Sequence, residues 1–344
     1  MPPSEVVSAY GLDQASFAPI EIGLINRTFR VEVGGVPTFV LQRQHHTFRG
    51  EVNLDIEAIT AHLASRGIGV PRLVRTRDGR AFVEHDGLAW RALTHLDGVT
   101  VARIEDPALA HAAAALVGRF HRAIDGFEHV FHFTRPGAHD TPAHLLRLAS
   151  ALSLHENHPA IKAVRPVAEA ILAHPLPALP SLPTRIIHGD LKITNLLFNA
   201  PLSDAVALLD LDTFQHATIA VELGDALRSW CNTRGESGEN VRVELPIFEA
   251  ALRGYAETAG DLLTSDERES IPLGLETIAL ELSSRFALDA LEDRYFAWDA
   301  SRYTSRSEHD LVRARSQLAL ARSARDLRDP MQGLVRTAFS LAAA

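Results

Sequence analysis

IIHGDLKITNLLFN, residues 186–199, places a group of polar residues between two apolar runs. A strand buried in a core does not need such residues, because each buried polar side chain requires a hydrogen-bond partner. Asp190 could orient or deprotonate an attacking hydroxyl, and Lys192 could neutralise a phosphate in transfer. Asn195 offers a carbonyl oxygen to a hard cation such as Mg²⁺. We therefore interpret this stretch as a loop that handles a phosphate and a metal.

A second carboxylate follows this loop at the end of the next predicted strand. The short apolar strand VALLDLD, residues 206–212, presents Asp210 at its exit. The spacing Asp–x–Lys–x–x–Asn, followed by an apolar strand that ends in Asp, is the arrangement of the protein-kinase catalytic loop and its metal-binding aspartate. The alternative is a hydrated turn in which Asp and Asn only form the turn. Asp212 shares a strand face with Asp210, so it could be a second metal ligand or a structural residue.

Composition limits the class of protein. The 344 residues are 46% hydrophobic, which is enough for a large core, and 34 basic residues against 43 acidic ones give a net charge of −9. Because no basic block occurs, we expect neither nucleic acid nor an anionic membrane as a partner. The single cysteine, Cys231, forms no internal disulfide, and neither a signal-peptide pattern nor an apolar run of membrane-spanning length is present. The sequence predicts a cytoplasmic protein.

The chain changes character near residue 95. Before it, FRVEVGG and PTFVLQRQ have strand composition, and two Asp-Gly pairs, Asp78–Gly79 and Asp86–Gly87, predict hairpins. A helix is expected between these strands, over residues 53–67. After residue 100 helices dominate, beginning with an N-cap at Asp106. We predict an α+β fold with a small β-rich lobe, residues 1–95, and a larger helical lobe, residues 96–344.

The first lobe is expected to bind the nucleotide. Gly23 opens a turn between two strands, and Asn26 and Thr28 supply donors near it, although the repeated glycines of a GxGxxG loop are missing and an ordinary hairpin explains the turn nearly as well. Kinases carry a lysine on the following strand. Here Gln42 occupies that position, and Glu57 on the predicted helix would be the partner of the missing lysine, or one of the residues of a solvated helix face.

Other polar residues are predicted to be structural. His188 is expected to hold the polar loop from behind, and Asp225 to cap a helix or fix the loop. Cys231 beside Trp230 is expected to be a small buried residue. The seventeen histidines show no paired metal-binding spacing, so we assign them no metal.

Taken together, these motifs resemble those of the aminoglycoside phosphotransferase and choline kinase superfamily, and within it the N-acetylhexosamine 1-kinase subgroup. The likeness runs over most of the chain through INRTFRVEV, FVLQRQ, GLAWRALTHLDG, HDTPAH, HGDLKITNLLF, ALLDLDT, LGDALRSWCN, SSRFALDALEDRYF and EHDLVRARSQ. The resemblance implies a bilobal protein-kinase-like fold with a hinge near residues 93–97. It further implies that ATP and Mg²⁺ bind between the lobes, with Asp190 as the base and Asn195 and Asp210 as metal ligands. The glutamine at Gln42 is similar to that subgroup's pattern.

The resemblance also sets expectations for the acceptor. It implies transfer of phosphate to the anomeric hydroxyl of an N-acetylated hexose, with Arg285 near the sugar. An ion pair between Arg285 and Asp289 would explain that arginine nearly as well. The roles of His139 and Asp140, which match the subgroup, stay unassigned. Open alternatives are another acceptor (a different sugar, homoserine, choline or an aminoglycoside) and a catalytically silent nucleotide- or sugar-binding protein.

Overall fold

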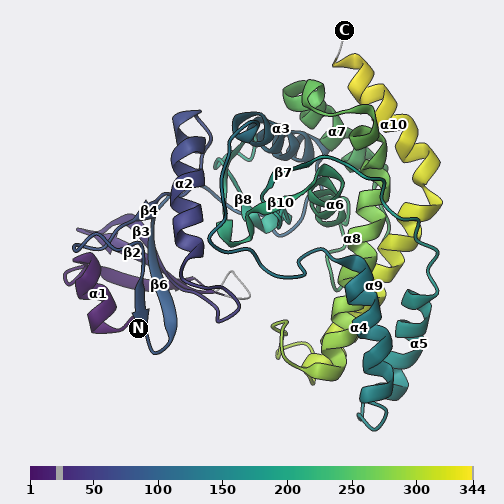
Figure 1. Ribbon diagram of the computed structural model, residues 1–344, viewed down its shortest axis with the longest axis horizontal. Coiled ribbons are helices and arrows are strands. Elements are labelled where there is room, and N and C mark those ends of the chain that lie inside the picture. The colour runs from purple at the N-terminus through teal and green to yellow at the C-terminus, as the bar shows by residue number, and fades with distance from the viewer. Residues whose placement is uncertain (21–25, 343–344) are drawn as a thin grey trace.

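A six-stranded antiparallel sheet is the main element of the first 94 residues (Figure 1). The computed structural model describes residues 1–20 and 26–342. The strands run in the order β1-β2-β3-β6-β4, with β5 also paired to β6. Their bounds are β1 Ser16–Ile20, β2 Arg27–Val33, β3 Val36–Arg43, β4 Leu73–Val74, β5 Val83–His85 and β6 Leu88–Thr94. Helix α1, Ser4–Tyr10, precedes the sheet, and α2, Val52–Ser65, lies between β3 and β4 in the chain.

Of the two predicted hairpins, one is confirmed and one is wrong. Asp86 and Gly87, with φ of 52° and 71°, join β5 to β6 as a tight hairpin. Asp78 and Gly79 also form a turn, closed by a backbone hydrogen bond of 3.0 Å from Thr76 to Arg80. The strands on either side of that turn do not pair with each other, because β4 and β5 lie one after the other along the same edge of β6.

Helix α2 confirms the helix expected after the first strands, and it packs mainly toward the helical part of the chain. Ile56, Ile59 and Leu63 are fully buried and belong to the large core that the helical part builds. The sheet has a smaller core of its own around Phe29, Leu41 and Trp90 (whole set: Val6, Leu12, Phe29, Val31, Leu41, Val83, Trp90, Ala92). The apolar face of α2 therefore joins the two parts.

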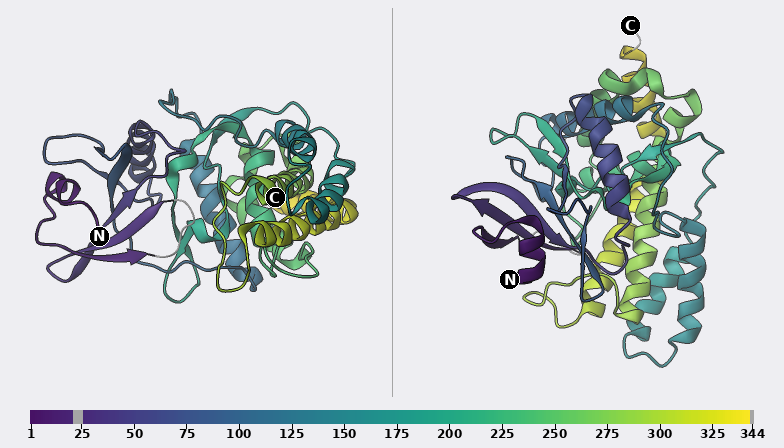
Figure 2. Two further views of the ribbon diagram at one scale, coloured as in Figure 1. Left: turned by 90° about the horizontal axis from the view of Figure 1, so that it is seen from below. Right: turned by 60° about the vertical axis from the view of Figure 1, so that its left-hand side comes forward.

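The remainder of the chain is mainly helical, as predicted (Figures 1 and 2). Its helices are α3 Pro107–Ile124, α4 Thr141–Leu154, α5 Ile161–Leu172, α6 Ile219–Trp230, α7 Leu245–Ala259, α8 Ser265–Glu292, α9 Arg306–Asp326 and α10 Arg328–Leu341. Two short antiparallel pairs lie among them: β7 Thr184–Ile187 with β10 Gln215–Thr218, and β8 Leu196–Phe198 with β9 Ala205–Leu208. Asp106 caps α3 as predicted, by accepting from the backbone N–H of Ala108. Among the described residues no helix combines the length and apolar composition needed to cross a membrane.

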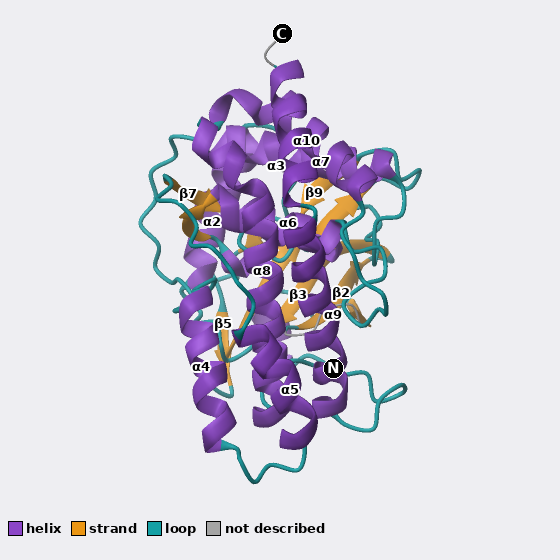
Figure 3. Ribbon diagram, turned by 90° about the vertical axis from the view of Figure 1, so that its right-hand side faces the viewer, coloured by secondary structure: helices purple, strands orange, loops and turns teal. Residues whose placement is uncertain are grey.

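The long helix α8 is the central element of the helical part (Figure 3). Helix α6 crosses it at a point where both helices carry glycine. A Cβ added to Gly224 would lie 2.5 Å from the backbone of Gly274, and one added to Gly274 would lie 2.1 Å from the carbonyl oxygen of Ala220. Because only glycine allows this approach, the pair brings α6 and its polar residues close to α8.

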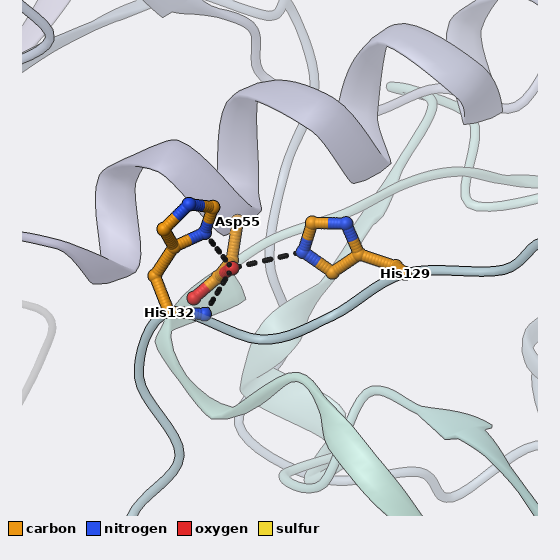
Figure 4. Close-up of side chains that lie close together, drawn as sticks. All are labelled: Asp55, His129 and His132. Atoms are coloured by element: carbon orange, nitrogen blue, oxygen red, sulfur yellow. Dashed lines mark hydrogen bonds and ion pairs between the residues drawn. The ribbon is translucent and has the colours of Figure 1, made fainter.

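A buried carboxylate fixes α2 to the loop that follows α3 (Figure 4). The Oδ1 of Asp55 accepts from His129 Nε2 at 2.8 Å, and from the backbone N–H and Nδ1 of His132, both at 2.9 Å. Its Oδ2 accepts from the backbone N–H of Phe133 at 3.0 Å. These groups lie close enough together to hold a metal ion, but four N–H donors already satisfy the carboxylate, so the arrangement is a hydrogen-bonded clamp.

Candidate active site

A cleft with a volume of about 790 Å³ lies between the sheet and the helical part. Its lining includes every described residue that the sequence predicted for the site, from β2 and β3 on one side to α8 on the other. These residues are Asn26, Thr28, Gln42, Asp190, Lys192, Asn195, Asp210 and Arg285. Gly23 lies outside the described residues.

The polar loop is fixed from behind by buried hydrogen bonds. His188 is fully buried, and its Nε2 donates to the carbonyl oxygen of Leu209 at 2.8 Å, which confirms its predicted structural role. The two oxygens of Glu222 on α6 accept from the backbone N–H groups of His188 and Gly189 at 2.8 and 2.9 Å. Gly189 has a φ of 78°, and a Cβ there would lie 2.6 Å from the carbonyl oxygen of Thr213. The loop therefore requires glycine immediately before Asp190.

Asp190 is held at the front of this loop by two neighbours. Lys192 Nζ donates to its Oδ2 at 2.6 Å, and Asn195 Nδ2 donates to the same oxygen at 3.0 Å. Burial alone disfavours the carboxylate, but the ammonium of Lys192 outweighs it and lowers the pKa of Asp190 to about 2. Asp190 is therefore ionised at neutral pH and acts as a hydrogen-bond acceptor.

Asp210 lies on the other side of the same ammonium. Its Oδ2 is 3.9 Å from Lys192 Nζ, and its backbone has a left-handed φ of 59° at the exit of β9. Burial raises the pKa of Asp210 above its ordinary value against the attraction of Lys192. A non-glycine residue in this conformation persists only where its surroundings hold it.

The donor set of the loop and Asp210 suits a divalent cation. Asp190 and Asp210 are carboxylates that share one ammonium, so further positive charge between them relieves repulsion. The side-chain nitrogen of Asn195 is engaged by Asp190, and within the described residues no donor reaches its Oδ1. Carboxylate and amide oxygens are the ligands that Mg²⁺ prefers.

On the sheet side, polar side chains form a row across three strands. Gln42 Nε2 donates to Thr28 Oγ1 at 3.2 Å, and Gln42 Oε1 accepts from Arg91 Nε and Nη2 at 2.9 and 2.7 Å. Arg91 is buried and forms an ion pair with both oxygens of Asp212, which also accepts from Asn26 Nδ2 at 2.7 Å. Arg91 is not among the site residues predicted from the sequence. The signal was present as a single charged residue inside the apolar strand LAWRALT.

Glu57 does not take the role that the kinase pattern predicted for it. It pairs instead with Arg75, at 2.6 Å between Nη2 and Oε2, on a partly exposed surface. The alternative of a solvated helix face is the correct one. Since Gln42 carries no charge, nothing at that strand position draws a carboxylate inward from α2.

The helical side of the cleft carries a second buried ion-pair cluster. Glu281 lies 3.3 Å from Nδ1 of His139 and 3.8 Å from Nη1 of Arg285. His139 Nε2 donates to the carbonyl oxygen of Gly189 at 3.0 Å, so this histidine, whose role the sequence left open, connects α8 to the polar loop. Burial lowers the pKa of His139, but the carboxylate of Glu281 outweighs burial and raises this pKa to about 9. Burial raises the pKa of Glu281, but His139 outweighs it and lowers this pKa to about 2.

The alternative of an ion pair between Arg285 and Asp289 is wrong, because Arg285 pairs with Glu281. Asp289 accepts instead from backbone N–H groups of residues 294–296, at 2.8–3.1 Å, and so closes the loop after α8. This loop brings Tyr295 and Phe296 beside Arg285, whose guanidinium carbon lies 5.7 and 5.5 Å from their ring centroids. Because the helix ends at Glu292, backbone donors compete successfully for Asp289.

Asp225 on α6 also faces the cleft. It pairs with Arg228 one turn later, at 2.8 Å between Oδ1 and Nη2. Its other oxygen, Oδ2, is buried and has no hydrogen-bond partner among the described residues. A buried orphan acceptor in a cleft is available to a bound hydroxyl or ammonium group. Asp140 has a local role, since its Oδ1 accepts from Ala143 at the start of α4.

This cleft, with its sheet on one side, its helices on the other and two carboxylates around one lysine, defines a kinase-like phosphotransferase. The chain belongs to the phosphotransferase enzyme family whose model matches residues 16–260. It is 28% identical to a homoserine kinase of Rhodopseudomonas palustris over 69% of this chain and 67% of that protein. With a homoserine kinase of Bradyrhizobium diazoefficiens it shares 30% identity over the same two fractions.

Solved structures support the fold. An aminoglycoside phosphotransferase from Alicyclobacillus acidocaldarius superposes with a TM-score of 0.59 at 17% identity, over 96% of this chain and 97% of that one. The amicoumacin kinase hAmiN, solved with AMP-PNP, Ca²⁺ and amicoumacin, superposes with a TM-score of 0.60 at 14% identity, over 90% and 89%. The predicted bilobal kinase-like fold and the phosphotransferase class are therefore confirmed. Homoserine is among the alternative acceptors expected from the sequence, whereas these relatives lend no support to an N-acetylhexosamine.

Proposed function

We propose that this chain transfers the γ-phosphoryl group of ATP to a hydroxyl group of a small polar acceptor. The observation that carries the proposal is the convergence of Asp190, Lys192, Asn195 and Asp210 in one cleft. A silent binding protein would have no need for two carboxylates that share one ammonium. The comparison with AMP-PNP and Ca²⁺ in hAmiN supports a nucleotide and a divalent cation, which we take to be Mg²⁺.

Each residue of the loop has a role that follows from its charge. Asp190, with its pKa near 2, is a weak base, so it orients the acceptor hydroxyl and takes its proton late in the transfer. Lys192 offsets the charge of the transferred group. Asn195 and Asp210 would hold Mg²⁺, which would supply positive charge to offset that of the nucleotide phosphates. Catalysis of this kind consists of alignment and electrostatic stabilisation.

We assign residues 1–95 to nucleotide binding and residues 96–344 to catalysis and acceptor binding. Strand β6 ends at Thr94, and His95, Leu96 and Gly98 of the following segment line the cleft, in agreement with a hinge near residues 93–97. Asn26 and Thr28 line the sheet side of the cleft, and they remain our candidates for nucleotide contacts together with Gly23.

For the acceptor we favour an N-acetylhexosamine, phosphorylated at its anomeric hydroxyl. The helical side of the cleft supports this choice with two features. Several of its charged groups are engaged in ion pairs (Glu281 with His139 and Arg285, Asp225 with Arg228), and such groups offer the hydrogen-bond donors and acceptors that a polyhydroxyl ligand requires. Tyr295 and Phe296 add aromatic surface for the apolar face of a sugar ring.

Homoserine is the second candidate, because the curated relatives described above are homoserine kinases. The same cleft carries charges of both signs, and an amino acid needs a carboxylate for its ammonium group and a cation for its own carboxylate. The unpartnered Oδ2 of Asp225 and the guanidinium of Arg285 could provide them.

A panel assay separates the candidates. ADP release with Mg·ATP would be measured for N-acetylglucosamine, N-acetylgalactosamine, glucose, galactose, homoserine, choline and kanamycin, and phosphorus NMR would identify the phosphorylated oxygen. Turnover of N-acetylated hexoses with an anomeric phosphate supports the first candidate, and turnover of homoserine alone replaces it with the second. ATP binding without turnover of any acceptor would contradict the kinase proposal.

A further inference from the structure

We propose that Arg91, Gln42 and Asp212 form a tie between the sheet and the metal-binding turn, and that this tie positions Asp210. Arg91 and Asp212 are then positioning residues for the metal site, and Gln42 serves this tie instead of the nucleotide. The inference rests on the proposed function, since it concerns the metal of the same cleft. It accounts for the absence of the strand lysine.

The hydrogen bonds of Arg91 support a positioning role. Its Nη1 reaches Oδ1 of Asp212 and, at 3.4 Å, Oδ1 of Asn53, while its Nη2 donates to Oδ2 of Asp212 at 3.0 Å. Its Nε and Nη2 donate to Gln42 Oε1. The five N–H groups of a guanidinium are thereby engaged, so Arg91 has no donor left for a phosphate.

Gln42 is engaged through both its oxygen and its nitrogen. Its oxygen accepts from Arg91, and its nitrogen donates to Thr28. Gln42 and Arg91 are direct partners in the antiparallel register of β3 and β6, so the contact is set by the sheet itself. A lysine at this position would place an ammonium beside a buried guanidinium and repel it.

The far end of the tie is the turn that carries the metal ligand. Asp212 stands two residues after Asp210, and the bond from Arg91 joins residues 121 positions apart. Asp212 also accepts from Asn26 at 2.7 Å and from Gln44 at 3.4 Å, so both of its oxygens are occupied and it is not a metal ligand in this arrangement. These contacts hold the turn in which Asp210 keeps its left-handed φ of 59°.

Protein kinases join the strand lysine to a helix glutamate, and that pair must be formed for activity. In this chain Glu57 faces Arg75 on the surface, and the buried ion pair from the sheet goes to Asp212. Partners of metal ligands orient them, and losing such a partner typically lowers metal affinity about 10- to 100-fold. We expect Arg91 to follow this pattern through Asp212.

The experiment compares Arg91→Gln, Arg91→Lys and Gln42→Lys with a control, Arg75→Gln, which breaks a partly exposed ion pair between the segment after β4 and helix α2. Calorimetry measures ADP affinity without metal, and Mn²⁺ affinity in the presence of ADP, with the thermal midpoint recorded for each variant. We expect Arg91→Gln to weaken Mn²⁺ binding about tenfold or more while metal-free ADP affinity stays within about twofold. The Mn²⁺ affinity of Arg91→Lys should lie between those of the wild type and Arg91→Gln, since an ammonium cannot bridge both oxygens of Asp212 and Gln42.

Gln42→Lys is the second test, and it does not depend on the folding of the Arg91 variants. Although this substitution restores the lysine typical of kinases, we expect it to weaken Mn²⁺ binding, because it adds a cation beside Arg91. Tighter nucleotide binding by Gln42→Lys would overturn the inference, as would an Arg91→Gln protein that loses thermal stability but keeps wild-type Mn²⁺ affinity. If the wild type itself bound neither ADP nor Mn²⁺ with ADP, the proposed function would fail instead.

Discussion

The ammonium nitrogen of Lys192 lies 2.6 Å from Oδ2 of Asp190, two residues earlier in the same loop. The same nitrogen is 3.9 Å from Asp210. One lysine therefore serves both Asp190 and Asp210, and its charge keeps the partly buried Asp190 ionised.

The first prediction concerns the loss of the Lys192 ammonium. In Lys192→Met only burial acts strongly on Asp190, so its pKa should rise from about 2 toward or above its ordinary value. Activity should then fall as the pH is lowered through a range where the wild type is unaffected. The measurement is the pH profile of kcat between about pH 4 and 8. An unchanged acidic limb in the variant would show that Lys192 does not control Asp190.

The second prediction concerns Asp190 itself. Asp190→Asn keeps the size of the side chain and removes its charge, so kcat should fall about 10²- to 10⁴-fold while ADP binding changes little. Initial rates and calorimetry measure the two quantities. Asp204→Asn, in the exposed turn between β8 and β9, is the control and should behave as wild type. Normal turnover by Asp190→Asn would contradict the assignment of this residue.

The third prediction concerns the acceptor side. Arg285→Gln should raise the KM of the acceptor about tenfold and leave the KM of ATP unchanged, because Arg285 lines the cleft from α8, away from the sheet. Steady-state kinetics with each substrate varied in turn provides the test. The matched control is Arg315→Gln on the exposed face of α9. A rise in the KM of ATP alone would show that Arg285 contacts the nucleotide and not the acceptor.

The fourth prediction is a pH dependence of stability. The folded-state pKa of His139, about 9, lies above its ordinary value of 6.5, so its pairing with Glu281 stabilises fully below pH 6.5 and is lost as the pH rises through about 9. The folded-state pKa of Glu281, about 2, lies below its ordinary value of 4.5. The stabilisation that Glu281 contributes is therefore present above pH 4.5 and is lost as the pH falls through about 2. His139→Gln should therefore cost up to about 3 kcal/mol near pH 6 and much less near pH 10. Urea unfolding at both pH values measures this, and an equal cost at both would contradict it.

The fifth prediction tests the clamp on α2. Asp55→Asn leaves one acceptor oxygen and one NH₂ group facing four N–H donors, so the free energy of unfolding should fall by about 2–4 kcal/mol. Chemical denaturation measures the change. Asp86→Asn, in the exposed β5–β6 hairpin, should be neutral. A cost below about 0.5 kcal/mol at Asp55 would mean that the clamp contributes little.

Local order in the chain determined the candidate catalytic loop. Asp190, Lys192 and Asn195 lie within six residues, and Asp210 follows at the end of one strand, so a single hairpin brings them together. The turn at Asp86–Gly87 and the cap at Asp106 were predictable for the same reason, because short-range backbone chemistry specifies them.

Only the tertiary structure decided which distant charges meet. Arg91 pairs with Asp212 across 121 residues, Glu281 reaches His139, and Glu57 turns to Arg75 instead of the sheet interior. Asp289 has a cationic neighbour, Arg285, one turn away, yet it accepts hydrogen bonds from the backbone of the next loop. Such contacts depend on strand order and on how helices pack against the sheet. No spacing within a single segment encodes that geometry, since the energy of a buried charge depends on everything folded around it.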